Sequence, residues 1–394
     1  MSRVLLFVFS LFIIVSCSYE STPIYEEVSL PDPFLFVVGS RMVSADEWPA
    51  RRAEIADQAQ EYEFGEKPAA PDTVSGTYSE ETIGDTTVRT LTVVCSEDGD
   101  EISFDCPVIL PSAGTAPYPA MIGIGWPSLN YSQLSGLGVA VIVLPNDDIA
   151  EQEGAHSRGT GKFYDLYGSS HSAGAMMAWA WGVSRLIDAL ETTPEANIDY
   201  ERLGVTGCSR NGKGALTAGA FDERIVLTIP QESGAGGAAS WRISQAQKDR
   251  GQNVQTLSQI VTENCWFRAN FGDFGSRVDD LPLDQHMIEA MCAPRGLLII
   301  ENTAQEWLGN RSTWANSNVA HLVWEALGVS GNMGVSQVGH SDHCVLPVSQ
   351  EPVVGAFIRK FLLDETGVNT NILETDGHFD FEAANWVDWT VPEF

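Results

Sequence analysis

Basic residues are scarce in this chain, which has 22 Lys and Arg against 53 Asp and Glu and a formal net charge of −31. An acidic surface repels nucleic acids and anionic membranes and favours solubility, so we expect no nucleic-acid partner and assign no specific partner to the charge. The sequence also lacks paired C-x-x-C or H-x-x-x-H spacings, so we expect no metal site. No Pro/Ser-rich linker, low-complexity tract or repeat interrupts the chain after residue 35. Residues 35–394 are therefore predicted to form a single domain.

The first residues have the pattern of an export signal. Met1 to Ser16 combines a positive start at Arg3 with the apolar run VLLFVFSLFIIV, which is too short to span a membrane comfortably. The following I-V-S-C also resembles a bacterial lipoprotein cleavage box with Cys17 as the acylated residue. Ordinary signal-peptide cleavage nearby fits equally well, so secretion and a lipid-anchored cell-surface location both stay open. Residues 17–34 are predicted to be a linker or lead-in.

Of the seven cysteines, six follow Cys17, and an even number in an exported protein suggests disulfides. The number of pairings that six cysteines allow is too large for the sequence to choose among them. Cys95 and Cys106 flank the turn-rich segment SEDGDEISFD and could close a hairpin. The alternative for each cysteine is a buried free thiol.

Strand-like and helical segments alternate along the chain. TTVRTLTVVC (86–95) and EISFDCPVIL (101–110) have the alternation of an antiparallel pair. PAMIGIGW (119–126) and GVAVIVLP (138–145) are apolar runs of the length expected for buried parallel strands. A helix is predicted over 172–191, and later strands and helices are predicted at LGVTG, IVLTIP, RGLLIIEN, VAHLVWEAL and VVGAFIRKFLL. This order predicts an α/β fold, a three-layer α/β/α sandwich around a mostly parallel central sheet.

The segment GVTGCSRNGKGA places Ser209 at a glycine-flanked turn between a short strand and a helix-like run. Such a strand-to-helix turn lifts a serine hydroxyl clear of the backbone and points backbone N–H groups at a developing oxyanion. The second glycine comes one residue later than in G-x-S-x-G, and a serine beside glycine is more often an ordinary turn residue. Ser209 is therefore a candidate nucleophile, and its assignment depends on an acid and a histidine elsewhere in the chain.

An acid and a histidine follow in the required order. Glu232 ends the strand-like run IVLTIPQE, and the segment GHSDHC further on contains His340 and His343. Serine, acid, histidine is the chain order of α/β-hydrolases, in which the imidazole moves the serine proton and the carboxylate fixes its tautomer. The acid comes only one strand after the nucleophile, which is early for that fold. His340 is the second candidate for the base.

These motifs resemble the glucuronoyl esterases, carbohydrate esterase family fifteen, particularly the fungal type. The likeness rests on TGCSRNGKGA, PQESGAGG and the histidine followed by cysteine and Leu-Pro, and it extends through residues 161–191, 284–302 and the EWLGN segment at 306–310. It covers roughly residues 30 to 390. The resemblance implies an α/β-hydrolase catalytic domain over 35–394, with the triad Ser209, Glu232 and His343 and with no metal or organic cofactor.

The resemblance also implies roles for residues beside the nucleophile. In that family the cysteine before the serine pairs with the cysteine after the histidine, here Cys208 with Cys344. A Cys265–Cys292 pair would follow only by exclusion, and the family does not imply it. The backbone N–H of Arg210 is one oxyanion donor of this fold, and the family implies that its guanidinium helps. A simple ion pair with an acid is the alternative for that arginine.

The uronic acid ring would be recognised by residues on three segments. The family implies that Lys213, Gln255 and Glu263 hydrogen-bond the sugar and that Trp307 packs on it. Polar groups for hydroxyls and an aromatic face for C–H surface suit carbohydrate recognition. Without the family, Lys213 would be a solvated helix lysine, and Trp266 and Trp307 would be core or rim aromatics.

The expected function is that of an exported serine esterase. It would hydrolyse the ester between 4-O-methyl-glucuronic acid of glucuronoxylan and lignin alcohols in plant cell walls, through an acyl-enzyme on Ser209. The same machinery would serve an acetyl xylan or general carbohydrate esterase, and a serine peptidase is a further alternative. The non-enzymatic alternative is a cell-surface carbohydrate-binding protein without activity. The complete set of Ser209, Glu232 and His343 argues against it.

Overall fold

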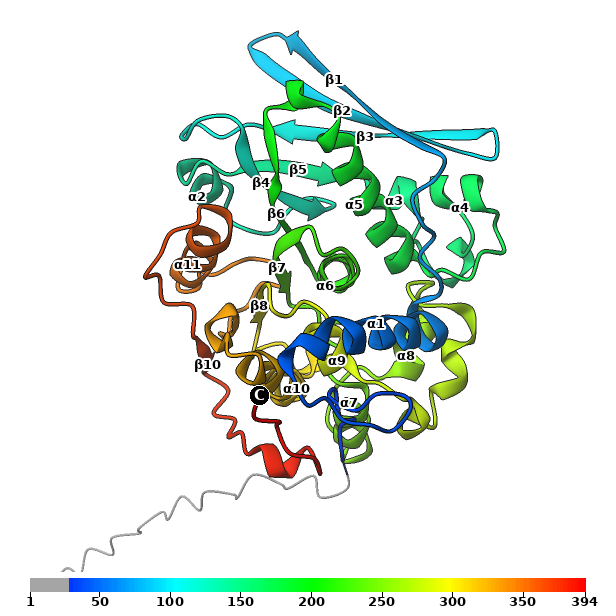
Figure 1. Ribbon diagram of the computed structural model, residues 1–394, viewed down its shortest axis with the longest axis vertical. Helices are drawn as coiled ribbons and strands as arrows, with labels where there is room; N and C mark the ends of the chain where they lie inside the picture. The colour runs from blue at the N-terminus through cyan, green and yellow to red at the C-terminus, as the bar shows by residue number, and fades with distance from the viewer. Residues whose placement is uncertain (1–27) are drawn as a thin grey trace, which may run out of the picture.

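The computed structural model describes residues 28–394, and one ten-stranded sheet organises them (Figure 1). The strand order is β1-β2-β3-β5-β4-β6-β7-β8-β9-β10. The strands are β1 (Thr73–Ile83), β2 (Thr86–Glu97), β3 (Asp100–Ile109), β4 (Tyr118–Ile124), β5 (Ala140–Leu144), β6 (Ile198–Cys208), β7 (Ile225–Gln231), β8 (Gly296–Glu301), β9 (Met333–Gln337) and β10 (Leu373–Thr375).

The sheet has an antiparallel and a parallel part. β1, β2, β3 and β5 pair antiparallel, whereas every pair from β5 through β4 to β10 is parallel. The chain runs from β4 to β5 on one side and then crosses to β6 on the other. In open α/β sheets, sites form at the carboxyl ends of strands near such a reversal of direction.

Helices cover both faces of the sheet, which Figure 1 shows nearly edge-on, with α2 and α11 on one side and α5 and α6 on the other. Neighbouring strand residues point to opposite faces, so that Met121, Val141 and Leu298 pack with α11 while Ile122 and Ile142 belong to the larger core on the other side. The helices are α1 (Trp48–Ala59), α2 (Tyr131–Gly136), α3 (Asn146–Ile149), α4 (Lys162–Tyr167), α5 (Ala175–Glu191), α6 (Arg210–Phe221), α7 (Trp241–Asp249), α8 (Leu257–Glu263), α9 (Gln285–Ala290), α10 (Asn310–Ala326) and α11 (Glu351–Leu362).

The predicted α/β/α sandwich of α/β-hydrolase type is confirmed. Both early antiparallel strands and the buried strands β4 and β5 lie where the apolar patterns placed them. The helix predicted over 172–191 begins at Ala175, and the helix predicted around 319–327 begins earlier, at Asn310. β1, β9 and β10 were not predicted.

The body of the protein begins earlier than predicted. Within the expected lead-in 17–34, Leu30 is buried against Ile243 and Trp386, and its N–H donates to the Trp386 carbonyl. Phe34 is fully buried as well. An apolar side chain buried in this way stabilises the fold, so residues 28–34 belong to the packed domain.

The export signal and Cys17 lie outside the described residues. Between residues 28 and 394, no helix has the length and apolar character needed to cross a bilayer.

Four cysteines in the described part of the chain are buried free thiols, so the alternative to the hairpin and Cys265–Cys292 disulfides holds for each of them. Cys95 pairs in register with Ile102 and Cys106 with Leu91, so the two cysteines lie four positions apart along the β2–β3 ladder. Four positions span about 13 Å, beyond the reach of a disulfide. Cys265 lies against the Glu151 carbonyl, and its expected partner Cys292 is also free.

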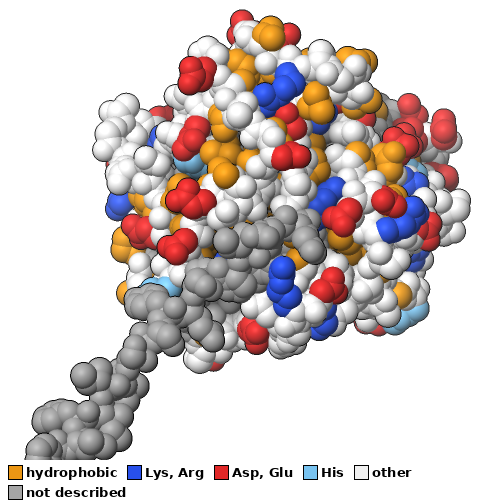
Figure 2. Space-filling model, turned by 90° about the horizontal axis from the view of Figure 1, so that it is seen from below, with side chains coloured by type: hydrophobic (Ala, Val, Ile, Leu, Met, Phe, Trp, Pro, Cys, Tyr) orange, Lys and Arg blue, Asp and Glu red, His pale blue; other side chains and the backbone are white. Residues whose placement is uncertain are grey.

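The acidic residues are dispersed on the face shown in Figure 2, with basic side chains among them. This distribution is that of a solvated acidic surface.

Candidate active site

Ser209 occupies a sharp turn between β6 and α6, the arrangement that the sequence predicted. β6 ends at Cys208, α6 begins at Arg210, and Ser209 has φ 59° and ψ −126°. Its backbone N–H donates to the Gln231 carbonyl at 2.9 Å, which ties the turn to β7. A Cβ on Gly207 would lie 2.4 Å from the Asn211 carbonyl oxygen. The glycine therefore permits the close approach of strand and helix that the turn requires.

Arg210 supplies a donor at the start of α6. The first N–H groups of a helix have no partner within the helix, so the Arg210 N–H is placed to bind an anion. Its exposed guanidinium lies over the buried ring of Trp266, 5.5 Å from the centroid. Beside it is a cavity of about 370 Å³ lined by residues 147, 148 and 151–153 as well as Arg210.

Glu232 is fully buried at the end of β7 and accepts hydrogen bonds at both carboxylate oxygens. Its Oε2 accepts from His343 Nδ1 at 2.6 Å and from the Cys344 backbone N–H at 3.2 Å. Its Oε1 accepts from Gln231 Nε2 at 3.2 Å. Burial alone would raise the pKa of Glu232, but the hydrogen bonds from His343 and Cys344 bring the pKa below its usual value. Glu232 is therefore ionised at neutral pH.

His343 has the tautomer that a general base needs. Because a carboxylate only accepts, the bond to Glu232 requires a proton on Nδ1, which leaves the lone pair of the neutral ring on Nε2. His343 Nε2 has no hydrogen-bond partner among the described residues, and no hydrogen bond joins it to Ser209 Oγ in this structure. Bonds of this kind are often long before substrate binds. Trp307 packs edge-on against the imidazole, with ring centroids 4.9 Å apart.

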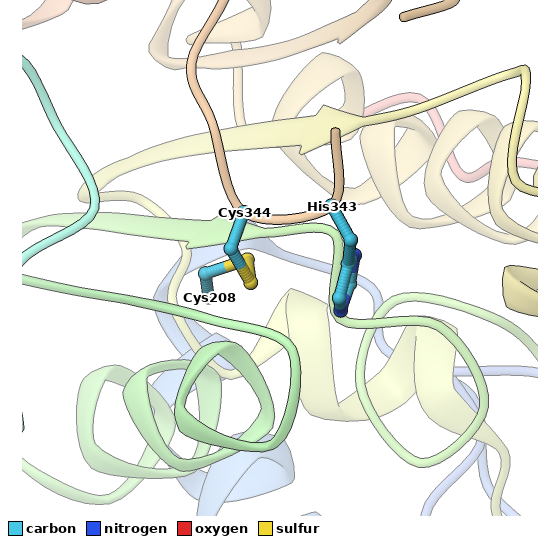
Figure 3. A group of neighbouring side chains, drawn as sticks. All are labelled: Cys208, His343 and Cys344. Atoms are coloured by element: carbon cyan, nitrogen blue, oxygen red, sulfur yellow. A yellow bond between two sulfur atoms is a disulfide. The ribbon is translucent and has the colours of Figure 1, made fainter. Parts of the chain in front are cut away.

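A disulfide links the serine turn to the histidine loop. Cys208 and Cys344 are bonded across 136 residues, with Cα atoms 5.6 Å apart, as the family resemblance implied. Figure 3 shows the bridge beside the His343 ring. Since Cys208 precedes Ser209 and Cys344 follows His343, the bridge brings these two segments together. The two sulfurs lie close to His343, but they are bonded to each other and so offer no thiolate to a metal.

Lys213 is buried beneath the site, where a solvated lysine had been the alternative. It is 4% exposed, its Nζ donates to the Ser233 carbonyl, and it lies 5.9 Å from the Trp266 ring centroid. Burial lowers the pKa of Lys213 to about 8, with the charges of Glu301 and Glu263 acting in the opposite direction. The ammonium group is thus mostly charged at neutral pH and poorly solvated.

Three of the other predicted sugar-binding residues are neighbours. Gln255 Nε2 donates to Glu263 Oε2 at 3.3 Å, and the Gln255 backbone N–H donates to the Trp307 carbonyl at 3.0 Å. Trp307 in turn contacts His343, so this group continues from the imidazole of that residue. Trp266, in contrast, is 2% exposed and belongs to the core.

The structure adds residues that sequence patterns did not indicate. Glu301 is fully buried, and burial raises its pKa to about 8. Its neighbour Asn302 contacts His340. His286 donates through Nε2 to the Pro31 carbonyl at 2.8 Å, which is a structural contact. Glu301 and Asn302 end the strand-like run RGLLIIEN. Their position at the end of a predicted strand was the feature of the sequence that could have indicated them as site residues.

The chain is similar to known enzymes over most of its length. A family model described as "Glucuronyl esterase, fungi" matches residues 93–328. The 4-O-methyl-glucuronoyl methylesterase of Hypocrea jecorina is 48% identical over 372 residues, which cover 94% of this chain and 77% of that protein. The 4-O-methyl-glucuronoyl methylesterase 1 of Wolfiporia cocos is 47% identical over 387 residues, covering 96% and 92% of the two chains.

Solved structures agree with this similarity. The glucuronoyl esterase catalytic domain from Hypocrea jecorina superposes with a TM-score of 0.87 at 48% identity, covering 95% of this chain and 99% of that one. A glucuronoyl esterase mutant from Sporotrichum thermophile, in complex with methyl 4-O-methyl-beta-D-glucopyranuronate, has a TM-score of 0.83 at 44% identity and covers 91% and 93% of the two chains.

Proposed function

The chain belongs to the fungal family of glucuronyl esterases, and on this premise we propose that Ser209, Glu232 and His343 form its catalytic triad. The protein is a carboxylic ester hydrolase of the 4-O-methyl-glucuronoyl methylesterase type, and its substrate is a carbohydrate ester. The observation that carries the proposed triad is the 2.6 Å hydrogen bond from His343 Nδ1 to the buried Glu232 carboxylate. The disulfide that ties Cys208 to Cys344 supports it.

The reaction follows from the protonation states of these groups. His343 Nε2 takes the proton of Ser209 Oγ as the oxygen attacks the ester carbonyl carbon of the uronate. The Arg210 N–H and guanidinium stabilise the oxyanion of the tetrahedral intermediate. When the ester bond breaks, Nε2–H gives its proton to the leaving alcohol, and Ser209 carries the acyl group. Water, deprotonated by His343, then attacks the acyl carbon, and the uronic acid leaves as Ser209 regains its proton.

Glu232 acts throughout as the partner of the imidazole. Its charge stabilises the imidazolium form of His343 after each proton transfer, and its Oε2 holds Nδ1 in place. Because the carboxylate is already ionised and hydrogen-bonded by Cys344 and Gln231, little reorganisation is needed when charge develops on the ring.

We place the uronic ring against Lys213, Gln255 and Glu263, with Trp307 packing on it. A charged donor, an amide and a carboxylate complement the hydroxyls of a sugar, and a half-buried indole complements its C–H face. The poorly solvated ammonium of Lys213 gains more from a sugar hydroxyl than a solvated lysine would.

The leaving alcohol is proposed to be a lignin alcohol of the plant cell wall. Val345, two residues after His343, is 55% exposed, so the loop that carries this histidine also presents an apolar side chain to solvent. Such an apolar surface favours an aromatic alcohol over a small polar one.

The export signal predicted over residues 1–16 supports action outside the cell. Lipid attachment at Cys17 would be tested by mass spectrometry of the mature N-terminus.

The test compares initial rates on benzyl glucuronate and on acetylated xylan, with Ser209→Ala as the control for contaminating esterases. The expected result is a large preference for benzyl glucuronate and a loss of about 10⁶-fold in kcat for the variant, with sugar binding retained. A preference for acetylated xylan would assign the protein to general carbohydrate esterases. Substantial activity in a clean Ser209→Ala preparation would refute the nucleophile.

A further inference from the structure

A second histidine faces the carboxylate of Glu232. His340 Nε2 lies 3.5 Å from Glu232 Oε1, the oxygen opposite the one that binds His343. The His340 side chain is 14% exposed, and its Nε2 atom is buried with no closer hydrogen-bond partner among the described residues. Glu232 therefore lies between two imidazoles, one at each oxygen.

Asn302 determines where His340 carries its proton. Asn302 Oδ1 accepts the backbone N–H groups of His340 at 3.1 Å and of Ala304 at 3.0 Å, so its amide nitrogen must be the atom that faces the ring. That nitrogen lies 3.2 Å from His340 Nδ1. Because an amide nitrogen only donates, Nδ1 is the acceptor, and the proton of the neutral ring is on Nε2. The N–H of His340 thus belongs on the side of Glu232.

The same contacts exclude His340 as the general base. A base must present a free lone pair to the Ser209 hydroxyl. The lone pair on His340 Nδ1 is taken by Asn302, and Nε2 carries the proton and faces a carboxylate. His343, in contrast, keeps its Nε2 free of partners in the described structure. His340 must act through another residue if it contributes to catalysis.

We propose that His340 is a positioning residue whose Nε2–H holds Oε1 of Glu232 and thereby keeps Oε2 against Nδ1 of His343. The inference rests on the triad proposed above. Gln231 Nε2 already donates to Oε1 at 3.2 Å, and a second donor at that oxygen further restricts rotation of the carboxylate about its last side-chain bond. The 3.5 Å contact would shorten as charge develops in the transition state. Asn302 is then the residue that fixes the orientation and tautomer of His340.

The experiment is a double-mutant cycle with Glu232, assayed on nitrophenyl acetate so that the outcome does not depend on sugar recognition. His340→Ala should lower kcat about tenfold with little change in KM, the size expected for a hydrogen bond to a charged group. In the Glu232→Ala background, His340→Ala should cause no further loss. His340→Gln, whose amide can donate to the same oxygen, should stay within about threefold of the wild type.

The controls separate positioning from support of the loop. Asp342→Ala, an exposed change two residues away, reports how far the loop tolerates substitution and should leave kcat unchanged. An equal loss from His340→Ala in both backgrounds would mean a structural role and would overturn the proposal, as would no loss at all. A loss as large as that of His343→Ala would make His340 the base. If Glu232→Ala itself were silent, the proposed triad would fail first, which is a distinguishable result.

Discussion

The disulfide between Cys208 and Cys344 should contribute both stability and catalytic geometry, and the two effects can be measured separately. It closes a loop with a sequence separation of 136 residues. In the chain-entropy model, a loop of that size restricts the unfolded chain by about 5 kcal/mol at 25 °C. For a domain of this size, whose unfolding entropy is about 0.8 kcal/mol/K, this corresponds to a decrease of about 6 °C in Tm when the bridge is removed.

The perturbation is the double variant Cys208→Ala/Cys344→Ala, which leaves no unpaired thiol. Cys95→Ala is the matched control, because it removes a buried thiol that forms no disulfide. Thermal unfolding measures stability, and kcat is measured at a temperature where both proteins are folded. We expect a lower Tm for the double variant than for the control. We also expect a reduced kcat, since the Cys344 N–H that binds Glu232 would no longer be held beside the serine turn.

Two results would refute this reasoning. A double variant as stable as the Cys95→Ala control would show that the unfolded chain is not restricted as the loop length implies. An unchanged kcat would show that the sheet alone holds the serine turn and the histidine loop in register, and that the bridge has no part in the geometry of the site.

Three further predictions concern the roles of single residues. Glu232→Gln should lower kcat by about 10⁴-fold, less than the loss of the nucleophile or base, because the amide no longer stabilises the His343 imidazolium; a silent variant would require another acid. Lys213→Ala or Glu263→Ala should reduce kcat/KM on glucuronate esters at least several-fold and leave nitrophenyl acetate hydrolysis nearly unaffected, whereas equal losses on both substrates would mean that these residues support the catalytic loops. Since burial lowers the pKa of Lys213 to about 8, its charged form is lost as pH rises through that value, so kcat/KM on a glucuronate ester should fall above about pH 8. Lys213→Met should remove that alkaline decrease, and a wild-type profile without it would show that the charge is not used.

The fold was predictable where burial imposes a pattern on the sequence. Strands such as β4 and β5 are buried on both faces and appear as apolar runs, and β2 and β3 alternate because only one face is buried. β1 has no fully buried residue and a polar sequence, so nothing in its composition distinguishes it from a loop. Its place is set by pairing with β2 and by Gly76, where a Cβ would collide with Thr193. These are contacts distant in sequence, which local patterns do not contain.

The candidate site shows the same division. Ser209 and Glu232 directly follow strands that the apolar runs locate, whereas His343 lies in the loop after β9, so for the three residues together only the chain order could be read. The contacts of His340 with Asn302 and with Glu232 could not, because they join segments that follow three separate strands. Disulfide pairing was equally inaccessible to pattern reasoning, and the hairpin bridge expected for Cys95 and Cys106 failed on strand register.

The backbone gives evidence for the site that does not depend on family resemblance. Seven residues other than glycine have positive φ in the described chain, and four of them are Asp, Asn or His, the residue types that adopt this conformation most readily. The remaining three are Ser209 at 59°, Glu232 at 46° and Cys344 at 66°.

Each of these three conformations costs of the order of 1–3 kcal/mol and persists only where the surroundings enforce it. The Ser209 N–H is bound to Gln231, the Glu232 N–H to Ile300, and Cys344 is fixed by its disulfide and by its hydrogen bond to Glu232. The unusual backbone is therefore confined to the residues that present a hydroxyl, hold an imidazole and tie the two loops together. This concentration of unusual backbone supports the proposed triad, whose reaction would need these groups at one point.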